Sequence, residues 1–115
     1  MSNDNWSSPT WILDLFKGYF DPCPLNHKIN GLKINWKKKN YVNPPYSKPK
    51  PWIEKAIEEN KKGKIVVMLL PVDTTTKWFS LLINAKAHVL FFNERLSFNN
   101  TKTPARWGNM LVILE

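Results

Sequence analysis

Residues 39–71 read KNYVNPPYSKPKPWIEKAIEENKKGKIVVMLLP, and this stretch decides the fold. Its first four residues predict a short β-strand. Residues 51–62 predict a helix with apolar positions on one side, where Pro51 suits the first turn and Gly63 suits the end. The closing run KIVVMLLP is continuously apolar, which is typical of a strand covered on both faces. The stretch therefore predicts a strand, a turn, a helix and a buried strand.

The segments on either side continue the alternation of strands and helices, which favours an α/β fold with a mostly parallel sheet and flanking helices. One domain spanning residues 1–115 is expected, since the chain is too short for two cores. Residues 93–106 are polar and lack periodicity. A further helix is expected over 9–17, and its inward side chains are Trp11, Ile12, Leu15 and Phe16. Another helix is expected over about 75–85, capped by Asp73 or Thr74. Its inward side chains are Trp78, Phe79, Leu82 and Ile83. Further strands are expected over 19–22, over 87–92 as a buried strand, and over 107–114.

The predicted strand and helix are joined by a tetrapeptide whose residue types suit attack by the exocyclic amine of a nitrogen base. The lone pair of such an amine is delocalised into the ring. The Asn43 side-chain oxygen and the Pro44 carbonyl can each accept one amine hydrogen, which turns the lone pair toward an electrophile. Pro44 and Pro45 stiffen the turn, and Tyr46 offers a face on which an extruded base can stack. Because ligands in open α/β sheets lie beyond the carboxyl ends of strands, a catalytic turn is predicted; a structural proline-rich turn is the alternative.

The charge of the chain indicates an anionic partner. The net charge is +8, and among 17 basic residues only Arg95 and Arg106 are arginine. A lysine-rich surface attracts phosphate independently of sequence, whereas base edges are usually read by arginine. Double-stranded DNA is the predicted partner, and plain solubility is the alternative reason for the lysines. The residues expected at DNA are Lys37, Lys38, Lys39, Lys48, Lys50, Arg95 and Arg106.

Other function classes receive little support from the sequence. Cys23 is the single cysteine, so it cannot form an internal disulfide, and nothing near it would activate it as a nucleophile. His27 and His88 have no cysteine or carboxylate at metal-ligand spacing, so no metal is predicted. No signal peptide or apolar run of membrane length is visible, which predicts a cytoplasmic protein without a membrane partner.

The chain resembles the small phage-type DNA adenine methyltransferases, which transfer a methyl group from S-adenosylmethionine to the 6-amino group of adenine. The resemblance extends over nearly the whole chain, and the Asn-Pro-Pro-Tyr turn is its part specific to chemistry. The other matching residues are, in order, Trp6 with Ser8 and Pro9, residues 20–23, Gly31 and Leu32 with Trp36, Leu70 and Pro71, Asp73 and Thr74 with Trp78 and Phe79, and Arg95 and Leu96 with Phe98.

This resemblance implies a reduced Rossmann-like methyltransferase fold with S-adenosylmethionine as cofactor and Asn43, Pro44, Pro45 and Tyr46 as catalytic residues. It implies that Asp21 contacts the charged end of the cofactor. The other residues implied at the cofactor are Trp6, Ser8, Pro9, Pro22 and Cys23. Residues 20–26 contain no glycine, unlike the glycine-rich turn of larger methyltransferases, so how the ribose is held stays open.

The implied function is site-specific methylation of a flipped adenine in DNA, in the cytoplasm of the host cell if a phage encodes the chain. Four alternatives stay open: methylation of the cytosine 4-amino group, methylation of RNA adenine, a non-catalytic nucleic-acid-binding module on the same fold, and a polyproline ligand for an SH3- or WW-type partner. A homodimer is also expected. A specific DNA interface usually takes ~1,000–2,500 Å² of protein surface, and six Trp and six Phe exceed the needs of so small a core.

Overall fold

The computed structural model describes residues 7–24, 30–98 and 107–115. Its centre is a sheet of four strands in the order β1-β2-β4-β3, formed by β1 Lys39–Val42, β2 Ile65–Pro71, β3 His88–Phe91 and β4 Asn109–Leu114. β1 and β2 are parallel, whereas β4 is antiparallel to both β2 and β3. The predicted α/β class is confirmed, but the prediction of a mostly parallel sheet is wrong, because the sheet is mixed. β4 enters the sheet from the opposite end, since no described helix after β3 carries the chain back across it.

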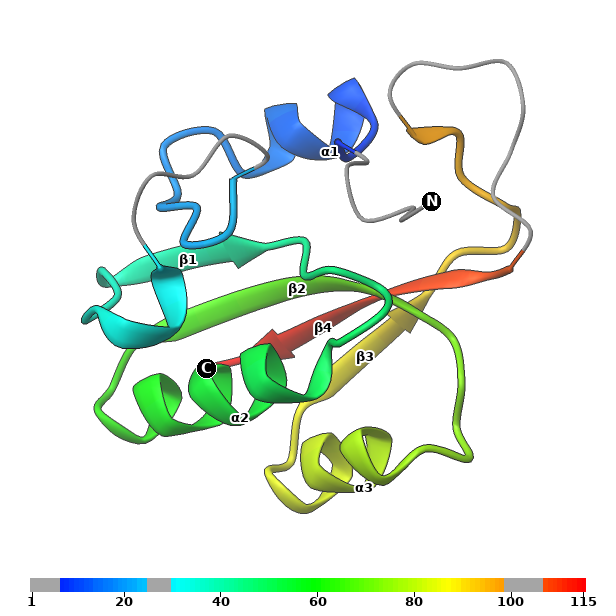
Figure 1. Ribbon diagram of the computed structural model, residues 1–115. Coiled ribbons are helices and arrows are strands. Elements are labelled where there is room, and N and C mark those ends of the chain that lie inside the picture. Colours follow the sequence, from blue (N-terminus) through cyan, green and yellow to red (C-terminus); the bar gives the residue numbers. More distant parts are fainter. Residues whose placement is uncertain (1–6, 25–29, 99–106) are drawn as a thin grey trace.

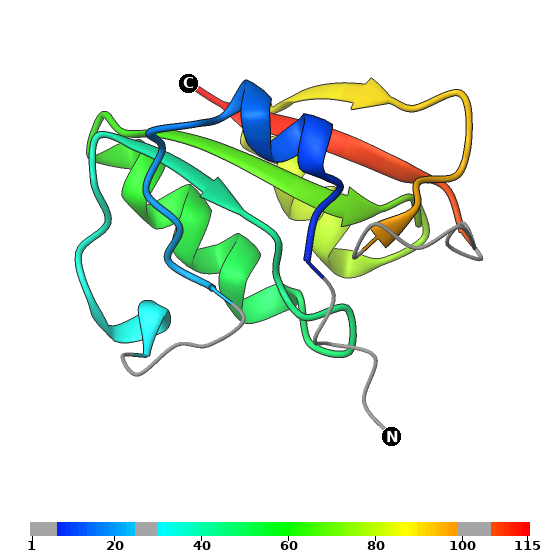
Figure 2. The same ribbon diagram turned by 90° about the horizontal axis from the view of Figure 1, so that it is seen from above.

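Helices lie on both faces of this sheet. α2 Lys50–Lys61 and α3 Lys77–Asn84 lie on one face, and the short α1 Thr10–Leu15 lies on the other (Figures 1 and 2). A 3-10 turn, η1 Gly31–Lys33, packs beside α2. None of the described helices is long and apolar enough to cross a membrane.

The core follows from the alternation of side chains along β2, where residues 66–70 are all buried. Val66, Met68 and Leu70 pack with residues of α2 and α3, while Val67 and Leu69 pack with Ile12 of α1. The prediction that this strand is covered on both faces is confirmed. Burial of each such side chain is worth roughly 1.5–3 kcal/mol, which makes β2 the main source of stability in the sheet.

The helix boundaries follow from local hydrogen bonds. α2 begins one residue before the predicted start, with Pro51 in its first turn, and Gly63 at φ +92 follows its end. α3 begins at Lys77, two residues later than predicted, because the cap is Thr76, whose hydroxyl accepts the Phe79 N–H at 3.2 Å. Asp73 instead accepts the Thr75 N–H, so the predicted caps Asp73 and Thr74 are wrong.

Three further expectations are corrected by the packing. Residues 19–22 form only an isolated parallel bridge, between Phe20 and Asn40, and no strand. Trp11 and Leu15 of α1 are exposed, because a helix of six residues buries Ile12 alone, and Ile83 of α3 is also exposed. The strand expected to be buried, β3, is an edge strand with Leu90 and Phe91 exposed, because β4 occupies the inner position.

A buried carboxylate ties α2 to the segment before β1. The Glu59 side chain has 0% exposure, and its oxygens accept the Trp36 N–H at 2.7 Å and the Lys62 ammonium at 2.8 Å. Lys64 also donates to it, and Lys55 lies 3.5 Å away. Burial opposes ionisation of Glu59, but these donors outweigh it and lower its pKa from 4.5 to about 2. The carboxylate is therefore charged under all ordinary conditions.

Glu59→Gln keeps the shape of the side chain and removes its charge. We expect the free energy of unfolding near neutral pH to fall by roughly 2–4 kcal/mol, because Lys62 and Lys64 lose their counter-charge and Trp36 N–H loses a charged acceptor. Since the pKa is lowered on folding, the wild-type stabilisation is present above pH 4.5 and is lost as the pH falls toward about 2. Urea unfolding at several pH values measures both effects.

The control is Glu58→Gln on the exposed side of the same helix, which should change stability by less than about 0.5 kcal/mol. A Glu59→Gln protein that loses as much stability on acidification as the wild type would contradict the account.

Candidate active site

The Asn-Pro-Pro-Tyr turn lies directly after β1 and before α2, as predicted from the sequence. Asn43 is half-buried, Pro44 is buried, and Pro45 and Tyr46 are partly buried. The Lys48 N–H donates to the Pro45 carbonyl at 3.2 Å, which closes the turn and leads into the helix. The turn is thus held at the carboxyl end of a parallel strand, where ligands usually bind in open α/β sheets.

Tyr46 is fixed by an aromatic cluster that it forms with Phe98 and Trp107. Its ring meets Phe98 edge-on at 6.0 Å between centroids and Trp107 at 5.4 Å. Its hydroxyl accepts a hydrogen bond from Asn109 Nδ2 at 2.8 Å. Burial raises the pKa of Tyr46, and the hydrogen bond from Asn109 only partly offsets this. The phenol therefore stays neutral, and both its ring and its hydroxyl contact other parts of the chain.

Ser8 and Tyr41 form a second polar group on the α1 face. Ser8 Oγ and Tyr41 Oη are 2.7 Å apart, and Phe16 stacks on the Tyr41 ring at 5.1 Å. Burial raises the pKa of Tyr41; the Ser8 hydrogen bond opposes this and the charge of Asp21 adds to it. Tyr41 was missed in the sequence analysis. Its signal is a hydroxyl-bearing residue in the strand that leads directly into the turn.

Asp21, Pro22 and Cys23 lie at the edge of the sheet beside β1. Phe20 N–H donates to the Lys39 carbonyl and Tyr41 N–H donates to the Phe20 carbonyl, each at 2.9 Å, which holds the segment against the strand. Asp21 Oδ1 accepts the Cys23 N–H at 2.9 Å. Desolvation raises the Asp21 pKa although part of the residue is exposed, and the Cys23 N–H opposes the rise. The segment therefore presents a carboxylate close to Tyr41.

The predicted DNA residues are not all gathered at the turn. Lys48 and Lys50 follow Tyr46 directly and are exposed. The exposed residues Lys37, Lys38 and Lys39 precede or begin β1. Since β1 runs four residues to Val42, they lie at the far end of a strand roughly 13 Å long. Extended backbone therefore separates these three lysines from the turn.

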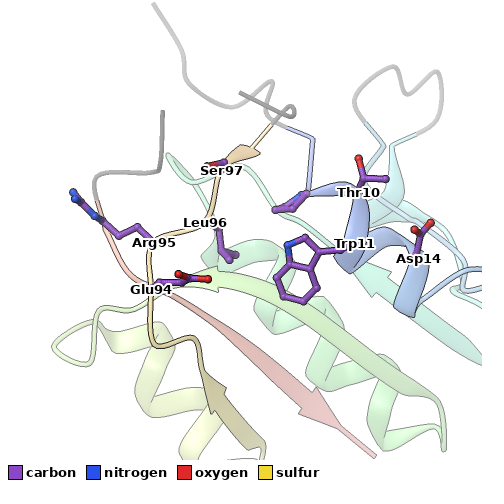
Figure 3. A pocket seen from close by; sticks show the side chains of 8 residues that line it. Thr10, Trp11, Asp14, Glu94, Arg95, Leu96 and Ser97 are labelled. Carbon is purple, nitrogen blue, oxygen red and sulfur yellow. The ribbon is translucent and has the colours of Figure 1, made fainter. Parts of the chain in front are cut away.

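A pocket of about 680 Å³ opens between the start of α1 and the segment after β3. Trp11 and Leu96 face one another across it, and the Arg95 guanidinium points away from them (Figure 3). The pocket brings Pro9, expected at the cofactor, close to Arg95, expected at DNA. Trp6 and Arg106, also expected at these sites, lie outside the described residues. Within the described ranges, no group of three metal-ligating side chains gathers.

Gly31→Ala tests the packing that supports the Asp21 segment. A Cβ on Gly31 would lie 1.8 Å from the Pro22 carbonyl oxygen and 3.0 Å from Trp52 Cη2. We expect a loss of roughly 1–3 kcal/mol of stability and displacement of residues 21–23, because backbone cannot yield as a side chain can. Thermal unfolding and the rate at which a disulfide reagent modifies Cys23, the single cysteine, measure the two effects.

Gly108→Ala is the matched control, since its Cβ would meet only Val72 Cγ2 at 3.8 Å, an ordinary contact. Equal behaviour of the two variants would refute the packing argument.

Comparison with known proteins shows the family of the chain. The family model for DNA N-6-adenine-methyltransferase (Dam) matches residues 22–114. A DNA N-6-adenine-methyltransferase of Haemophilus phage HP1 is 35% identical over 97% of this chain and 79% of its own length. One of Escherichia phage T1 is 29% identical over 82% of this chain and 47% of its own length. No solved structure matches. With the Asn-Pro-Pro-Tyr turn inside the matched region, the chain belongs to the Dam family of DNA N-6-adenine-methyltransferases.

Proposed function

We propose that this chain transfers a methyl group from S-adenosylmethionine to the 6-amino group of an adenine extruded from duplex DNA. The observation that carries the proposal is the position of Asn43 to Tyr46 at the carboxyl end of β1 in a member of the Dam family. The phage relatives are named for adenine in DNA, which favours this substrate over cytosine, RNA or a module without catalysis.

The chemistry assigned to the turn is activation of the adenine amine. Asn43 Oδ1 and the Pro44 carbonyl accept the two amine hydrogens, so the nitrogen lone pair turns out of the ring plane. The Tyr46 ring holds the extruded base by stacking. The cofactor supplies a methyl group on a sulfonium. Asn43 and Pro44 would aim the nitrogen lone pair at that methyl group. The bound cofactor would give up the methyl group and keep the electron pair on sulfur, and the amine would release one proton to water.

The cofactor is proposed to lie between the Asp21 segment and the start of α1. The residues fit the cationic part of the cofactor: Asp21 supplies a carboxylate, while Pro22, Cys23 and Pro9 supply largely apolar walls. Ser8 is engaged with Tyr41 at 2.7 Å, so its assigned role is to hold the segment that closes over the cofactor. Trp6 is assigned to the same region on family resemblance.

The fold is proposed to be a reduced Rossmann-like methyltransferase domain spanning residues 1–115. β1, β2 and β3 run in one direction with β4 alone reversed, so the carboxyl ends of three strands meet at one edge. Asn43 lies at that edge. This arrangement supports placing both substrates there.

DNA contacts are assigned to the exposed cations on the turn side, Lys48 and Lys50, together with Arg95 on the rim of the pocket and Arg106. Lys37, Lys38 and Lys39 serve duplex binding at a greater distance from the target base. Such contacts to phosphate position the duplex, while arginine is the residue type suited to reading base edges.

The working form is proposed to be a homodimer with β3 at its interface. In the described part of the chain β3 pairs on one side only, with β4. Leu90 and Phe91 on it are 56% and 60% exposed. An edge strand with no charged residue or proline among Leu90 and its neighbours Val89 and Phe91 readily pairs with another copy. A two-fold pair would supply the duplex with a second binding surface.

Asn43→Ala tests the catalytic assignment. We expect a loss of more than roughly a hundredfold in methyl transfer, because the amine loses an acceptor that acts most strongly in the transition state. The purified protein is incubated with labelled S-adenosylmethionine and duplex DNA, and nucleosides are identified by mass spectrometry. Cofactor affinity and unfolding should stay close to those of the wild type.

Asn84→Ala, at the exposed end of α3, is the control and should keep wild-type activity. Comparable activity of Asn43→Ala, or methylation by the wild type at a position other than the adenine 6-amino group, would refute the proposal.

Leu90→Lys tests the dimer. We expect its dissociation constant to rise by at least about tenfold, because a charge replaces an apolar contact at the paired edge. Sedimentation equilibrium measures this, and Ile83→Lys on α3, an apolar residue of similar exposure, should leave association unchanged. A wild-type protein that remains a fully active monomer on DNA at every concentration would contradict the proposal.

A further inference from the structure

Asn109, the first residue of β4, connects the ends of the other three strands. Its side chain has 0% exposure. Nδ2 donates to Tyr46 Oη at 2.8 Å and lies 3.3 Å from the Leu70 carbonyl near the end of β2. Its backbone carbonyl accepts the Phe92 N–H, just beyond β3, at 3.1 Å. Asn109 therefore joins the turn after β1 to the ends of β2 and β3.

An asparagine at this position is costly for the fold alone. Its Oδ1 is buried and has no hydrogen-bond partner among the described residues. An unsatisfied buried oxygen is destabilising, and an apolar side chain would pack beside Met110 without that cost. The two hydrogens of Nδ2, by contrast, are both used, one of them on the tyrosine of the catalytic turn. The contacts thus indicate that Asn109 is needed for its hydrogen bond to the Tyr46 hydroxyl.

Tyr46 needs such a partner because its aromatic contacts leave one freedom open. Phe98 and Trp107 meet the ring at interplanar angles of 79° and 64°. Edge contacts of this kind limit where the ring lies, but they leave sideways movement of its hydroxyl end less restricted. A hydrogen bond to the hydroxyl, at the far end of the ring from the backbone, fixes the tip. The ring is then held before a base arrives.

We propose that Asn109 is a positioning residue for methyl transfer, acting through the Tyr46 hydroxyl to fix the ring against which the extruded adenine is held. The inference rests on the proposed function and adds a residue to which the sequence analysis assigned no role. It also gives the Tyr46 hydroxyl a role, to fix the position of the ring, whereas stacking by itself requires only the ring.

The test is a double-mutant cycle of Tyr46→Phe and Asn109→Ala with single-turnover methylation as the readout. Each single variant should lower the rate by about tenfold, the value of one well-placed hydrogen bond. If Asn109 acts through the hydroxyl, the double variant should be no slower than the slower single variant. Extrusion of 2-aminopurine at the target position is measured by its fluorescence. The variants that slow methyl transfer most should also impair this extrusion most, while their cofactor affinity stays unchanged.

Tyr46→Phe keeps the ring and leaves the Leu70 contact in place, so it tests the bond even if Asn109→Ala does not fold. Asn60→Ala is the matched control: its Nδ2 also donates to a backbone carbonyl, that of Lys64 at 2.9 Å, at the far end of α2. It should lose stability without slowing transfer in the folded protein.

Rate losses that multiply in the double variant would overturn the inference, because Asn109 would then support the sheet independently of Tyr46. A full wild-type rate for Tyr46→Phe would overturn it as well. In both cases the wild type remains active and the proposed function stands. A wild type that transfers no methyl group to DNA would refute the proposed function and the inference together.

Discussion

Burial of β2 on both faces is the constraint on which the remainder of the structure depends. Five consecutive residues, 66–70, are buried, so the strand needs helices on both faces and a neighbour on both edges. β1 and β4 are those neighbours, and the crossover from β1 to β2 brings α2 onto one face. Alternation along the strand then divides the core into two clusters, one against α2 and α3 and one against α1.

The polar contacts that hold the Asn-Pro-Pro-Tyr turn lie at the end of the sheet where the pairing between strands stops. Beyond Val42, Pro71 and Phe91 the strands can no longer satisfy all of their backbone groups with one another. Asn109, Tyr46 and the Pro45 carbonyl provide hydrogen bonds there. A site built at this edge is held by the rigid strands beneath it, although the chain around it is irregular.

The lysines differ in whether they pair with a buried carboxylate or are exposed beside the turn. Near the end of α2, three lysines surround the buried Glu59. The Glu59 carboxylate also accepts the Trp36 N–H, which ties the segment before β1 to the helix. Those lysines are engaged with the carboxylate. Lys48 and Lys50, which follow the Asn-Pro-Pro-Tyr turn, have no such buried partner among the described residues. They are therefore the cations best suited to phosphate, whereas the positions of Lys37, Lys38 and Lys39 make them remote from the turn.

The sequence by itself determined the local elements and the position of the Asn-Pro-Pro-Tyr turn between a strand and a helix. β1, α2, β2 and β4 were predictable within about two residues, because apolar periodicity, the proline at 51 and the glycine at 63 act over short distances. Only the tertiary structure decided that β4 runs antiparallel between β2 and β3, that β3 is an exposed edge, and that Asn109 lies 2.8 Å from Tyr46. These features depend on how segments 63 residues apart meet, and no pattern within either segment encodes that contact.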